Sequence, residues 1–235
     1  MSTEDNDPEE YRQLRFEAPP GSTELLLIRH GESAVARPGQ PFPLADGHAD
    51  PNLAPEGREQ ALRVADRLSV AKIDHIYVTT LRRTVQTAAP TAERLGLTPT
   101  VEPGLREVYL GEWEGGLFRQ KIAENGDIAQ RLFTEQRWDV IPGAEPSDRF
   151  AARVREAVER LTAAHRDQTI AVFTHGGVIG QVLAQASKSR AFAFIGADNG
   201  SISHLVITPQ VWIIRRFNDT AHLDPAFTLV PSPLT

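Results

Sequence analysis

Three short apolar segments, separated by long helical patterns, constrain the fold of this chain more than any other feature. They are "ELLLIR" (24–29), "IDHIYVT" (73–79) and "TIAVFTH" (169–175), and the first and last are apolar almost throughout. Continuous apolar strands are typical of a parallel sheet that helices cover on both faces. The sequence therefore predicts an α/β domain with a mostly parallel central sheet.

The segments between and after these strands carry the period of an amphipathic helix. They span residues 55–69, 82–96, 147–165 and 177–187. Gly96 is expected to close the second helix, and Pro90 inside it is expected to bend or restart it. Ser147 is expected to be the N-cap of the third helix. In the first helix we expect one buried face, made of Ala61, Leu62, Ala65 and Leu68.

The remaining segments complete the organisation of the chain. A short strand is expected at 98–103, and 202–208 and 211–217 are expected to form a hairpin. We expect one domain over 23–220, with 104–146 inserted as a small helical cap. The acidic residues 1–22 and the segment 221–235 are expected to be a flexible arm and a loose tail.

Composition excludes several classes of function. The chain has no cysteine, which excludes disulfides, thiolate nucleophiles and cysteine-bound metals. Its net charge of -6 argues against general nucleic-acid binding. No stretch approaches the roughly 20 apolar residues that cross a bilayer, and the N-terminus does not resemble a signal peptide. We therefore expect a cytoplasmic protein without a nucleic-acid or membrane partner.

Reactive side chains follow each of the three apolar strands. The first strand ends in Arg29-His30-Gly31, the second is followed by Arg82-Arg83, and the third ends in His175-Gly176. Because parallel strands end at the same edge of a sheet, these groups are expected to meet in one pocket. Two imidazoles and two guanidiniums there suit a phosphate, whose oxygens arginine binds with two parallel hydrogen bonds.

Several blocks in this order resemble the histidine phosphatase superfamily, in its phosphoglycerate mutase-like branch. "LLLIRHGES" (25–33) resembles the signature of that family, and "FTHGGVIG" (173–180) resembles its second-histidine block. "TTLRRTVQTA" (79–88) is similar to the block that carries a phosphate-binding arginine, and the alignment selects Arg83 instead of Arg82. "LREVYLGEWEG" (105–115) is similar to the acid block and places the acid at Glu107.

The resemblance implies a fold and a catalytic mechanism. The fold would have three layers, as in phosphoglycerate mutase, with helices on both faces of the sheet. His30 would attack the phosphorus and form a covalent phosphohistidine, and Glu107 would be the general acid and base. The other groups that would bind the phosphate are Arg29, Gly31, Ser33, Arg83, His175 and Gly176. No metal is implied, and the substrate would be a small phosphorylated metabolite.

Some features depart from the family pattern or leave its reaction open. The family often has a phosphate-binding asparagine where this chain has Ala36, so that ligand is absent or comes from elsewhere. Hydrolysis of phosphate monoesters is the favoured function. The alternatives are a phosphoglycerate mutase, which would need 2,3-bisphosphoglycerate as cofactor, and a catalytically silent phosphate-binding module. The part of the insertion at 114–146 has few basic residues for a mutase: Arg119, Lys121, Arg131 and Arg137.

The leaving group and the oligomeric state stay open at this level. Trp113 is expected to pack beneath the cap, Asn199 to be structural, and Glu145 to help form the pocket wall. The strand at 211–217 is a candidate edge for a homodimer, although its hairpin partner explains it equally well. The apolar residues of the insertion either contact the substrate or form its buried face: Phe118, Ile122, Leu132, Phe133 and Trp138.

Overall fold

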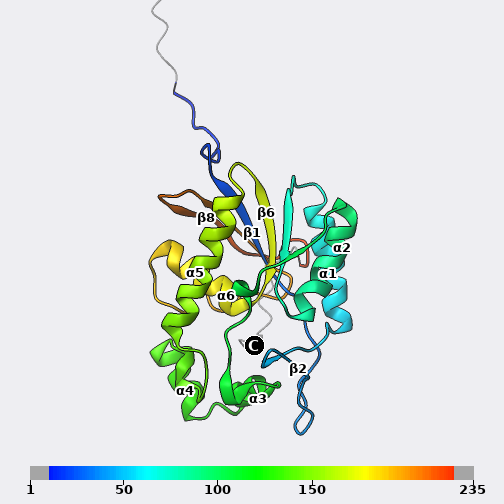
Figure 1. The fold of residues 1–235 in the computed structure, drawn as a ribbon, viewed down its shortest axis with the longest axis vertical. Coiled ribbons are helices and arrows are strands. Elements are labelled where there is room, and N and C mark those ends of the chain that lie inside the picture. The colour runs from blue at the N-terminus through cyan, green and yellow to red at the C-terminus, as the bar shows by residue number, and fades with distance from the viewer. Residues whose placement is uncertain (1–10, 225–235) are drawn as a thin grey trace, which may run out of the picture.

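A six-stranded sheet forms the centre of the computed structural model, which describes residues 11–224 of the chain. The strand order is β5-β4-β6-β1-β7-β8. The first three pairs in this order are parallel, whereas β7 pairs antiparallel with both β1 and β8. The mostly parallel sheet and the C-terminal hairpin are thus confirmed (Figure 1). The strands are β1 (Thr23–Arg29), β4 (His75–Val78), β5 (Thr100–Val101), β6 (Thr169–Thr174), β7 (Ile202–Ile207) and β8 (Trp212–Asp219).

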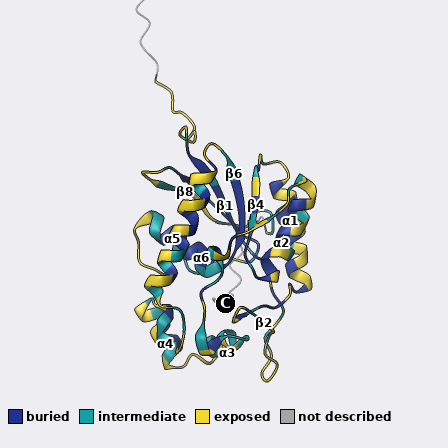
Figure 2. Cartoon of the chain, in the orientation of Figure 1, coloured by how far each residue is buried: buried dark blue, intermediate teal, exposed yellow. Residues whose placement is uncertain are grey.

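Helices cover both faces of the sheet because its central strands are apolar on both sides. Leu25 and Leu27 of β1 pack into one buried cluster with residues of α5 and α6, whereas Ile28 packs into the other with residues of α1 and α2. Figure 2 shows the buried centre and the exposed outer faces of these helices. The four helices are α1 (Pro55–Leu68), α2 (Arg82–Leu95), α5 (Ser147–Ala164) and α6 (Gly176–Ser187).

Three local expectations for these helices are wrong. Leu62 of α1 is half exposed, and Val64 is the buried residue instead. The buried residues Ala61, Val64, Ala65 and Leu68 follow the three- and four-residue spacing of one helix face, and Leu62 lies outside that face. α2 runs past Pro90 without a restart, because Ala88 and Ala92 on either side hold one continuous face against the sheet. The N-cap of α5 is Pro146, and the Ser147 hydroxyl forms hydrogen bonds with the Trp138 N–H and with Asp139 instead of capping the helix.

The insertion at 104–146 forms short helices beyond the end of the sheet, on the side away from the N-terminal segment (Figure 1). Ser147 joins it to α5, since its hydroxyl accepts the Trp138 N–H at 3.0 Å and donates to Asp139 at 3.2 Å. The small hairpin of β2 (Leu44–Ala45) and β3 (His48–Ala49) lies beside it. The elements are η1 (Pro103–Leu105), η2 (Gly111–Trp113), α3 (Leu117–Glu124), α4 (Asp127–Glu135) and η3 (Trp138–Val140).

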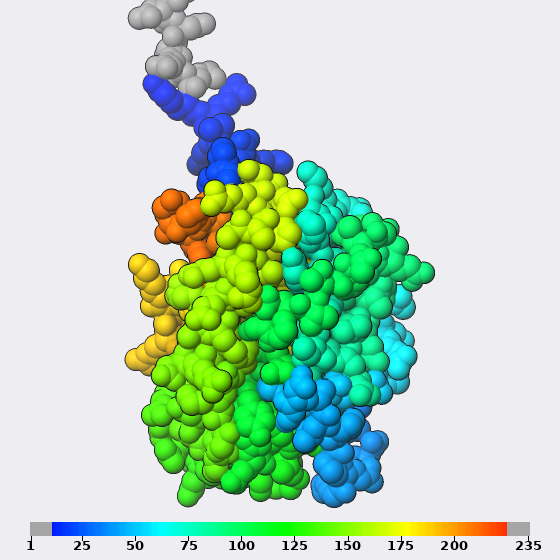
Figure 3. Space-filling model, in the orientation of Figure 1, coloured from blue at the N-terminus to red at the C-terminus, as the bar shows by residue number. Residues whose placement is uncertain are grey.

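The N-terminal segment leaves the body of the molecule at the opposite end (Figure 3). Residues 11–20 are exposed, and Arg215 of β8 lies 3.8 Å from the centre of the Phe16 ring. Residues 1–10 and 225–235, which include most of the expected arm and tail, lie outside the described residues. Within residues 11–224, no helix is both long and apolar enough to cross a membrane. β8 is an edge of the sheet, and pairing of two copies there stays a prediction.

Candidate active site

The carboxyl ends of β1 and β6 bring His30 and His175 together, as the sequence predicts. Arg29 pairs with Thr174 across the two strands, so the next residue of each strand is a histidine. The two imidazole centroids are 5.2 Å apart, with the ring planes at 63°. The His30 N–H donates to the Thr174 carbonyl at 3.0 Å, and the Asn199 amide donates to the His30 carbonyl at 2.8 Å. Asn199, expected to be structural, therefore fixes the backbone of His30.

The hydrogen bonding of His30 leaves one ring nitrogen available for attack. Nδ1 lies 2.8 Å from the Gly31 carbonyl oxygen, and a carbonyl only accepts, so Nδ1 carries the proton. The lone pair is then on Nε2. Burial lowers the pKa of His30 well below its ordinary value of 6.5, and the charges of Arg83 and Arg29 lower it further. His30 is therefore a neutral imidazole at pH 7, which a nucleophile must be.

His175 is enclosed completely and is oriented by a pair of threonine hydroxyls. Its Nε2 lies 3.0 Å from Thr79 Oγ1, which lies 3.1 Å from Thr84 Oγ1. Burial, followed by the charge of Arg83 and the neighbouring His30, lowers its pKa well below 6.5. Thr79 and Thr84 flank the arginine pair in the sequence, but no pattern there indicates that they contact a histidine about 90 residues away.

Gly31 was expected to bind phosphate through its N–H, but in the structure it contacts Thr87 and the start of α1. Its N–H donates to Thr87 Oγ1 at 3.0 Å, so the expected contact of this N–H with phosphate is not supported. A Cβ at position 31 would lie 2.3 Å from the Gly57 carbonyl oxygen, which real Cβ atoms do not approach. The missing side chain of Gly31 therefore lets the start of α1 lie directly against the loop that follows His30.

Arg29, the guanidinium next to the candidate nucleophile, lies beside Gly176 and lines the cavity. A Cβ at Gly176 would lie 3.4 Å from Arg29 Nε, which is an ordinary contact distance. Arg29 Nη1 donates to the Ala197 carbonyl, and burial lowers the pKa of Arg29 while the Glu107 charge opposes that shift. The bond to Ala197 fixes the orientation of the guanidinium in the cavity.

The two arginines that begin α2 have separate positions. Arg83 lines the cavity, is 8% exposed and donates to the Ala49 carbonyl at 2.8 Å. Burial lowers its pKa to about 10. Arg82 points outward and is held by Asp50, which accepts its Nε at 2.7 Å and its backbone N–H at 2.8 Å. The geometry thus places Arg83, and not Arg82, where a phosphate would bind.

Glu107 lies in the same cavity as His30, near the start of the 104–146 insertion. Its carboxylate accepts the Gly177 N–H at 3.2 Å and the Val108 N–H at 3.0 Å. Gly177 is in the first turn of α6, so the partial positive charge of that helix end also faces the carboxylate.

Arg153 of α5 fixes the segment that carries Glu107. Its guanidinium donates to the carbonyls of Gly104, Arg106 and Glu107 at 2.7–2.9 Å, and it forms a two-bond ion pair with Glu145. Glu145 was expected in the wall of the active pocket, and this expectation is wrong. It lines a separate hollow together with Arg153, because the ion pair turns it toward α5.

Arg119 of α3 is a site residue that the sequence interpretation missed. It donates to Ser33 Oγ at 2.6 Å and to the Ala34 carbonyl at 2.9 Å, and its charge further lowers the pKa of His30. Ser33 and Arg119 both line the cavity. The only signal in the sequence was Ala36, which left a phosphate ligand unaccounted for. Nothing in the pattern of the insertion indicated which basic residue turns inward.

The cavity has a volume of about 130 Å³ and two chemically different sides. One side carries the reactive groups: Arg29, His30, Ser33, Arg83, Glu107 and Arg119. The other side is mostly apolar. Of the five apolar cap residues singled out in the sequence, only Phe118 and Trp138 line it, and Trp113, expected to pack, does so as well. Phe133 faces Phe192 instead.

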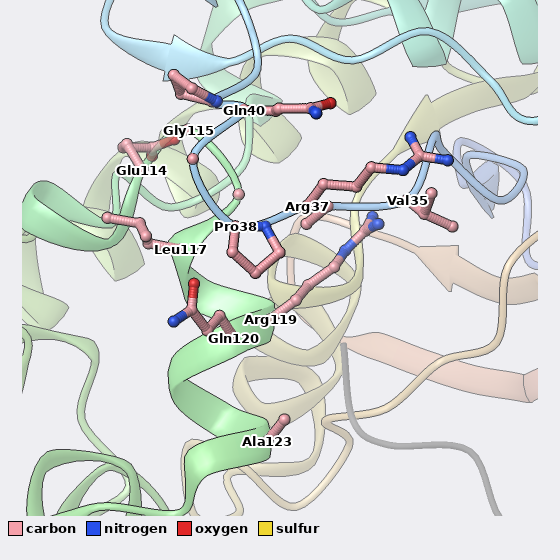
Figure 4. A pocket seen from close by; sticks show the side chains of 14 residues that line it. Val35, Arg37, Pro38, Gln40, Glu114, Gly115, Leu117, Arg119, Gln120 and Ala123 are labelled. Atoms are coloured by element: carbon pink, nitrogen blue, oxygen red, sulfur yellow. The ribbon is translucent and has the colours of Figure 1, made fainter.

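A larger groove of about 670 Å³ adjoins this cavity (Figure 4). It lies between the segment 35–41 and α3, and it shares Glu114, Gly116 and Arg119 with the cavity as lining residues. Arg119 and Arg37 both reach into this region in Figure 4. Arg119 is therefore a wall that the two hollows have in common.

The site combines two neutral imidazoles, three guanidiniums and the carboxylates of Glu107 and Glu114. Guanidiniums bind and neutralise phosphate oxygens, a neutral imidazole attacks phosphorus, and a carboxyl group transfers protons. Within residues 11–224, no three His, Cys, Asp or Glu side chains are grouped so as to hold a metal ion. The groups present suit transfer of a phosphoryl group to His30.

Comparisons with known proteins agree with this chemistry of phosphoryl transfer. The family model of the histidine phosphatase superfamily (branch 1) matches residues 25–220. Phosphoglycerate mutase-like protein 4 of Arabidopsis thaliana is 34% identical over 206 residues, which cover 86% of this chain and 87% of that protein. The metal-independent phosphoserine phosphatase of the same plant is 28% identical over 207 residues, covering 86% of this chain and 83% of that protein.

A solved structure is similar over most of the chain. The mycobacterial glucosyl-3-phosphoglycerate phosphatase superposes with a TM-score of 0.70 at 27% identity, covering 85% of this chain and all of the other. The similarity therefore extends well beyond the short blocks around His30.

Proposed function

Because the chain belongs to the histidine phosphatase superfamily, we propose that it hydrolyses phosphate monoesters through a covalent phosphohistidine on His30. One observation carries this proposal. His30 Nδ1 is bound to the Gly31 carbonyl, so the free lone pair of Nε2 belongs to a neutral ring that shares its cavity with Arg29, Arg83 and Glu107.

In the first step His30 Nε2 attacks the phosphorus in line with the ester oxygen. The nitrogen–phosphorus bond forms as the phosphorus–oxygen bond breaks, and the electron pair of the broken bond goes to the leaving oxygen. Glu107, protonated at this stage, donates its proton to that oxygen. Arg29, Arg83 and Arg119 hold the three remaining phosphate oxygens and the charge spread over them.

In the second step water replaces the departed alcohol. Glu107, now a carboxylate, takes a proton from this water, and the water oxygen attacks the phosphorus. The nitrogen–phosphorus bond breaks, its electron pair returns to Nε2, and phosphate leaves. Glu107 regains its proton, so the site is ready for another ester without any cofactor.

The positions of the basic residues in the cap favour a phosphatase over a mutase. Lys121, Arg131 and Arg137 form ion pairs with Glu124, Glu135 and Asp139, and only Arg119 of these four lines the cavity. A mutase has to hold an intermediate with two phosphates and a carboxylate. One further guanidinium is a poor match for those additional charges, so we propose no requirement for 2,3-bisphosphoglycerate.

Product analysis tests this function. The protein is given 3-phosphoglycerate and a panel of other monoesters, with and without 2,3-bisphosphoglycerate, and also with EDTA. We expect free phosphate, no change with EDTA, and no turnover by the His30→Ala protein. Conversion to 2-phosphoglycerate without phosphate release would replace the phosphatase by a mutase. Bound but unreacted ester in every case would leave only a binding module.

Quenching in alkaline detergent tests the covalent step separately. After brief reaction with a ³²P-labelled ester, we expect protein-bound label on the wild-type protein that is stable in alkali and lost in acid, and no label on the His30→Ala protein. Label on the His30→Ala protein would place the nucleophile on another residue.

A further inference from the structure

The apolar side of the cavity is not used by the phosphoryl chemistry. Four aromatic side chains form most of it, here called the aromatic wall: Phe42, Trp113, Phe118 and Trp138. The Phe118 ring is central, with its centroid 6.1 Å from that of Trp113 and 6.2 Å from that of Trp138. These separations are typical of packed aromatic pairs. Trp113, Phe118 and Trp138 therefore form one packed aromatic surface, and Phe42 lines the same cavity beside Arg119.

The aromatic wall is held in place from behind, so its shape exists before a ligand binds. The backbone N–H groups of Trp138 and Phe42 donate to Ser147 and to the Gly115 carbonyl. Phe192 packs on Trp138 from the other side, with 4.9 Å between centroids. Trp113 and Trp138 are almost fully buried, whereas Phe42 and Phe118 are only partly buried. Phe118 thus offers an accessible face, whereas the Arg119 guanidinium lies over the Phe42 ring, 5.9 Å from its centre.

Glu114, the second carboxylate that lines the cavity, already has partners in the protein. It accepts the backbone N–H groups of Ala49 and Leu110 at 2.6 and 2.9 Å. Among the described residues that line the cavity, the cations are Arg29, Arg83 and Arg119, and the proposed mechanism assigns all three to the phosphate oxygens. A charged group on the leaving alcohol would lie against aromatic rings, where charge is costly to desolvate.

We propose that the leaving group of the natural substrate is a flat, apolar alcohol without a carboxylate or ammonium beside its ester oxygen. The phosphate binds to the guanidiniums, and the apolar body of the alcohol packs on the face of Phe118, next to Trp113 and Trp138. This inference rests on the proposed phosphatase function and specifies its substrate class. It separates this chain from the phosphoserine phosphatase to which it is similar, since phosphoserine carries both charges next to the ester.

Three esters with the same kind of bond to phosphorus test the proposal. Ethyl phosphate, 2-phenylethyl phosphate and O-phosphoserine all release a primary alcohol, so their intrinsic reactivity is similar and their bodies differ. We expect kcat/KM for 2-phenylethyl phosphate to exceed that for either other ester by about tenfold or more, the range that an apolar pocket provides. Equal values, or a preference for O-phosphoserine, would overturn the proposal.

Matched variants then locate the preference. Phe118→Ala removes the centre of the aromatic wall and should lower kcat/KM for 2-phenylethyl phosphate about tenfold, while ethyl phosphate changes less than twofold. Phe133→Ala is the control, because Phe133 is a cap phenylalanine of similar exposure that faces Phe192 outside the cavity. If the Phe118 variant does not fold, the same two kcat/KM values are measured for the Phe42→Ala protein. Equal effects of the Phe118 and Phe133 variants would overturn the proposal.

The two levels of the proposal fail in different ways. Phosphate release from all three esters at equal rates, with acid-labile label on His30, would overturn only the assignment of the leaving group. Absence of both phosphate release and label would overturn the phosphatase function, and the substrate class with it.

Discussion

Substituting Gly177 by alanine tests the role of Glu107 without removing any reactive group. A Cβ on Gly177 would lie 2.5 Å from Glu107 Oε1, whereas ordinary contacts begin near 3.4 Å. The carboxylate, as the flexible partner, must therefore retreat by about 0.9 Å. Gly177 has ordinary helical geometry in α6, where alanine is favoured over glycine by up to about 1 kcal/mol. The variant should fold at least as well as the wild type.

The size of the effect follows from the displacement. A general acid contributes roughly 10²–10⁴-fold, and a misplacement of about 1 Å costs on the order of 10²-fold. That loss corresponds to about 2.7 kcal/mol of transition-state stabilisation. It should appear in kcat/KM for an alkyl ester, because kcat/KM reports the transfer to His30 and the leaving oxygen needs a proton. It should be small in kcat/KM for 4-nitrophenyl phosphate, whose leaving group is stable as an anion. The two esters share the later hydrolysis step, in which Glu107 activates water, so kcat does not separate them.

The assay compares both esters for the wild-type, Gly177→Ala and Gly126→Ala proteins. Gly126, before α4, is the control because a Cβ there meets nothing within 4 Å. Thermal unfolding confirms that each variant is folded. Glu107 would not be the proton donor if the Gly177 variant kept kcat/KM for the alkyl ester within twofold of the wild type. The same conclusion would follow if kcat/KM fell equally for the two esters.

Three further perturbations separate the other groups of the site. Arg83→Ala should lower kcat/KM about 10²-fold or more and Arg82→Ala less than about threefold, since only Arg83 faces the phosphate; equal losses would contradict this placement. Arg119→Ala should raise KM about tenfold by removing one charge-assisted contact, and an unchanged KM would exclude Arg119 as a phosphate ligand. Burial lowers the pKa of His30 and His175 in the folded state, so both should be neutral above pH 6.5. The acid limb of kcat/KM should therefore lie below pH 6.5, and a limb above it would contradict a neutral nucleophile. Stability in urea should be full above pH 6.5 and fall as the pH drops toward the lowered pKa values, and a gain in stability on acidification would contradict the shift.

The phosphate end of the site was largely predictable from sequence. His30 and His175 follow two apolar strands, and parallel strands end at one edge, so their proximity follows from the strand pattern alone. The choice of Arg83 over Arg82 came from resemblance, and its physical basis appears only in the structure. Asp50 accepts a hydrogen bond from Arg82 and holds that side chain away from the cavity. The sequence around the two arginines does not predict this contact.

Other site residues could not be predicted because tertiary contacts alone determine them. Arg119 lies on a cap helix none of whose residues is fully buried, so periodicity does not distinguish its inner face. Arg153 lies on a clearly amphipathic helix, where an arginine is usually a solvated side chain, yet it holds three carbonyls near the start of the insertion. In both cases the partner is more than 40 residues away in the chain.

The two sides of the cavity come from different parts of the chain, and this division has a consequence for specificity. The phosphate side, apart from Glu107 and Arg119, lies in the central domain, at or just after the end of β1 and at the start of α2, where a shift of the backbone would disturb the sheet. The aromatic wall comes from the cap and the loop that contains Phe42, which meet through single contacts such as the Phe42 N–H to the Gly115 carbonyl. Gly116 lies beside that contact, and a Cβ there would come within 2.9 Å of the Phe42 ring. The rings of the wall can therefore change without altering the geometry around His30, so the leaving group has to be inferred from the wall and not from the phosphate motif.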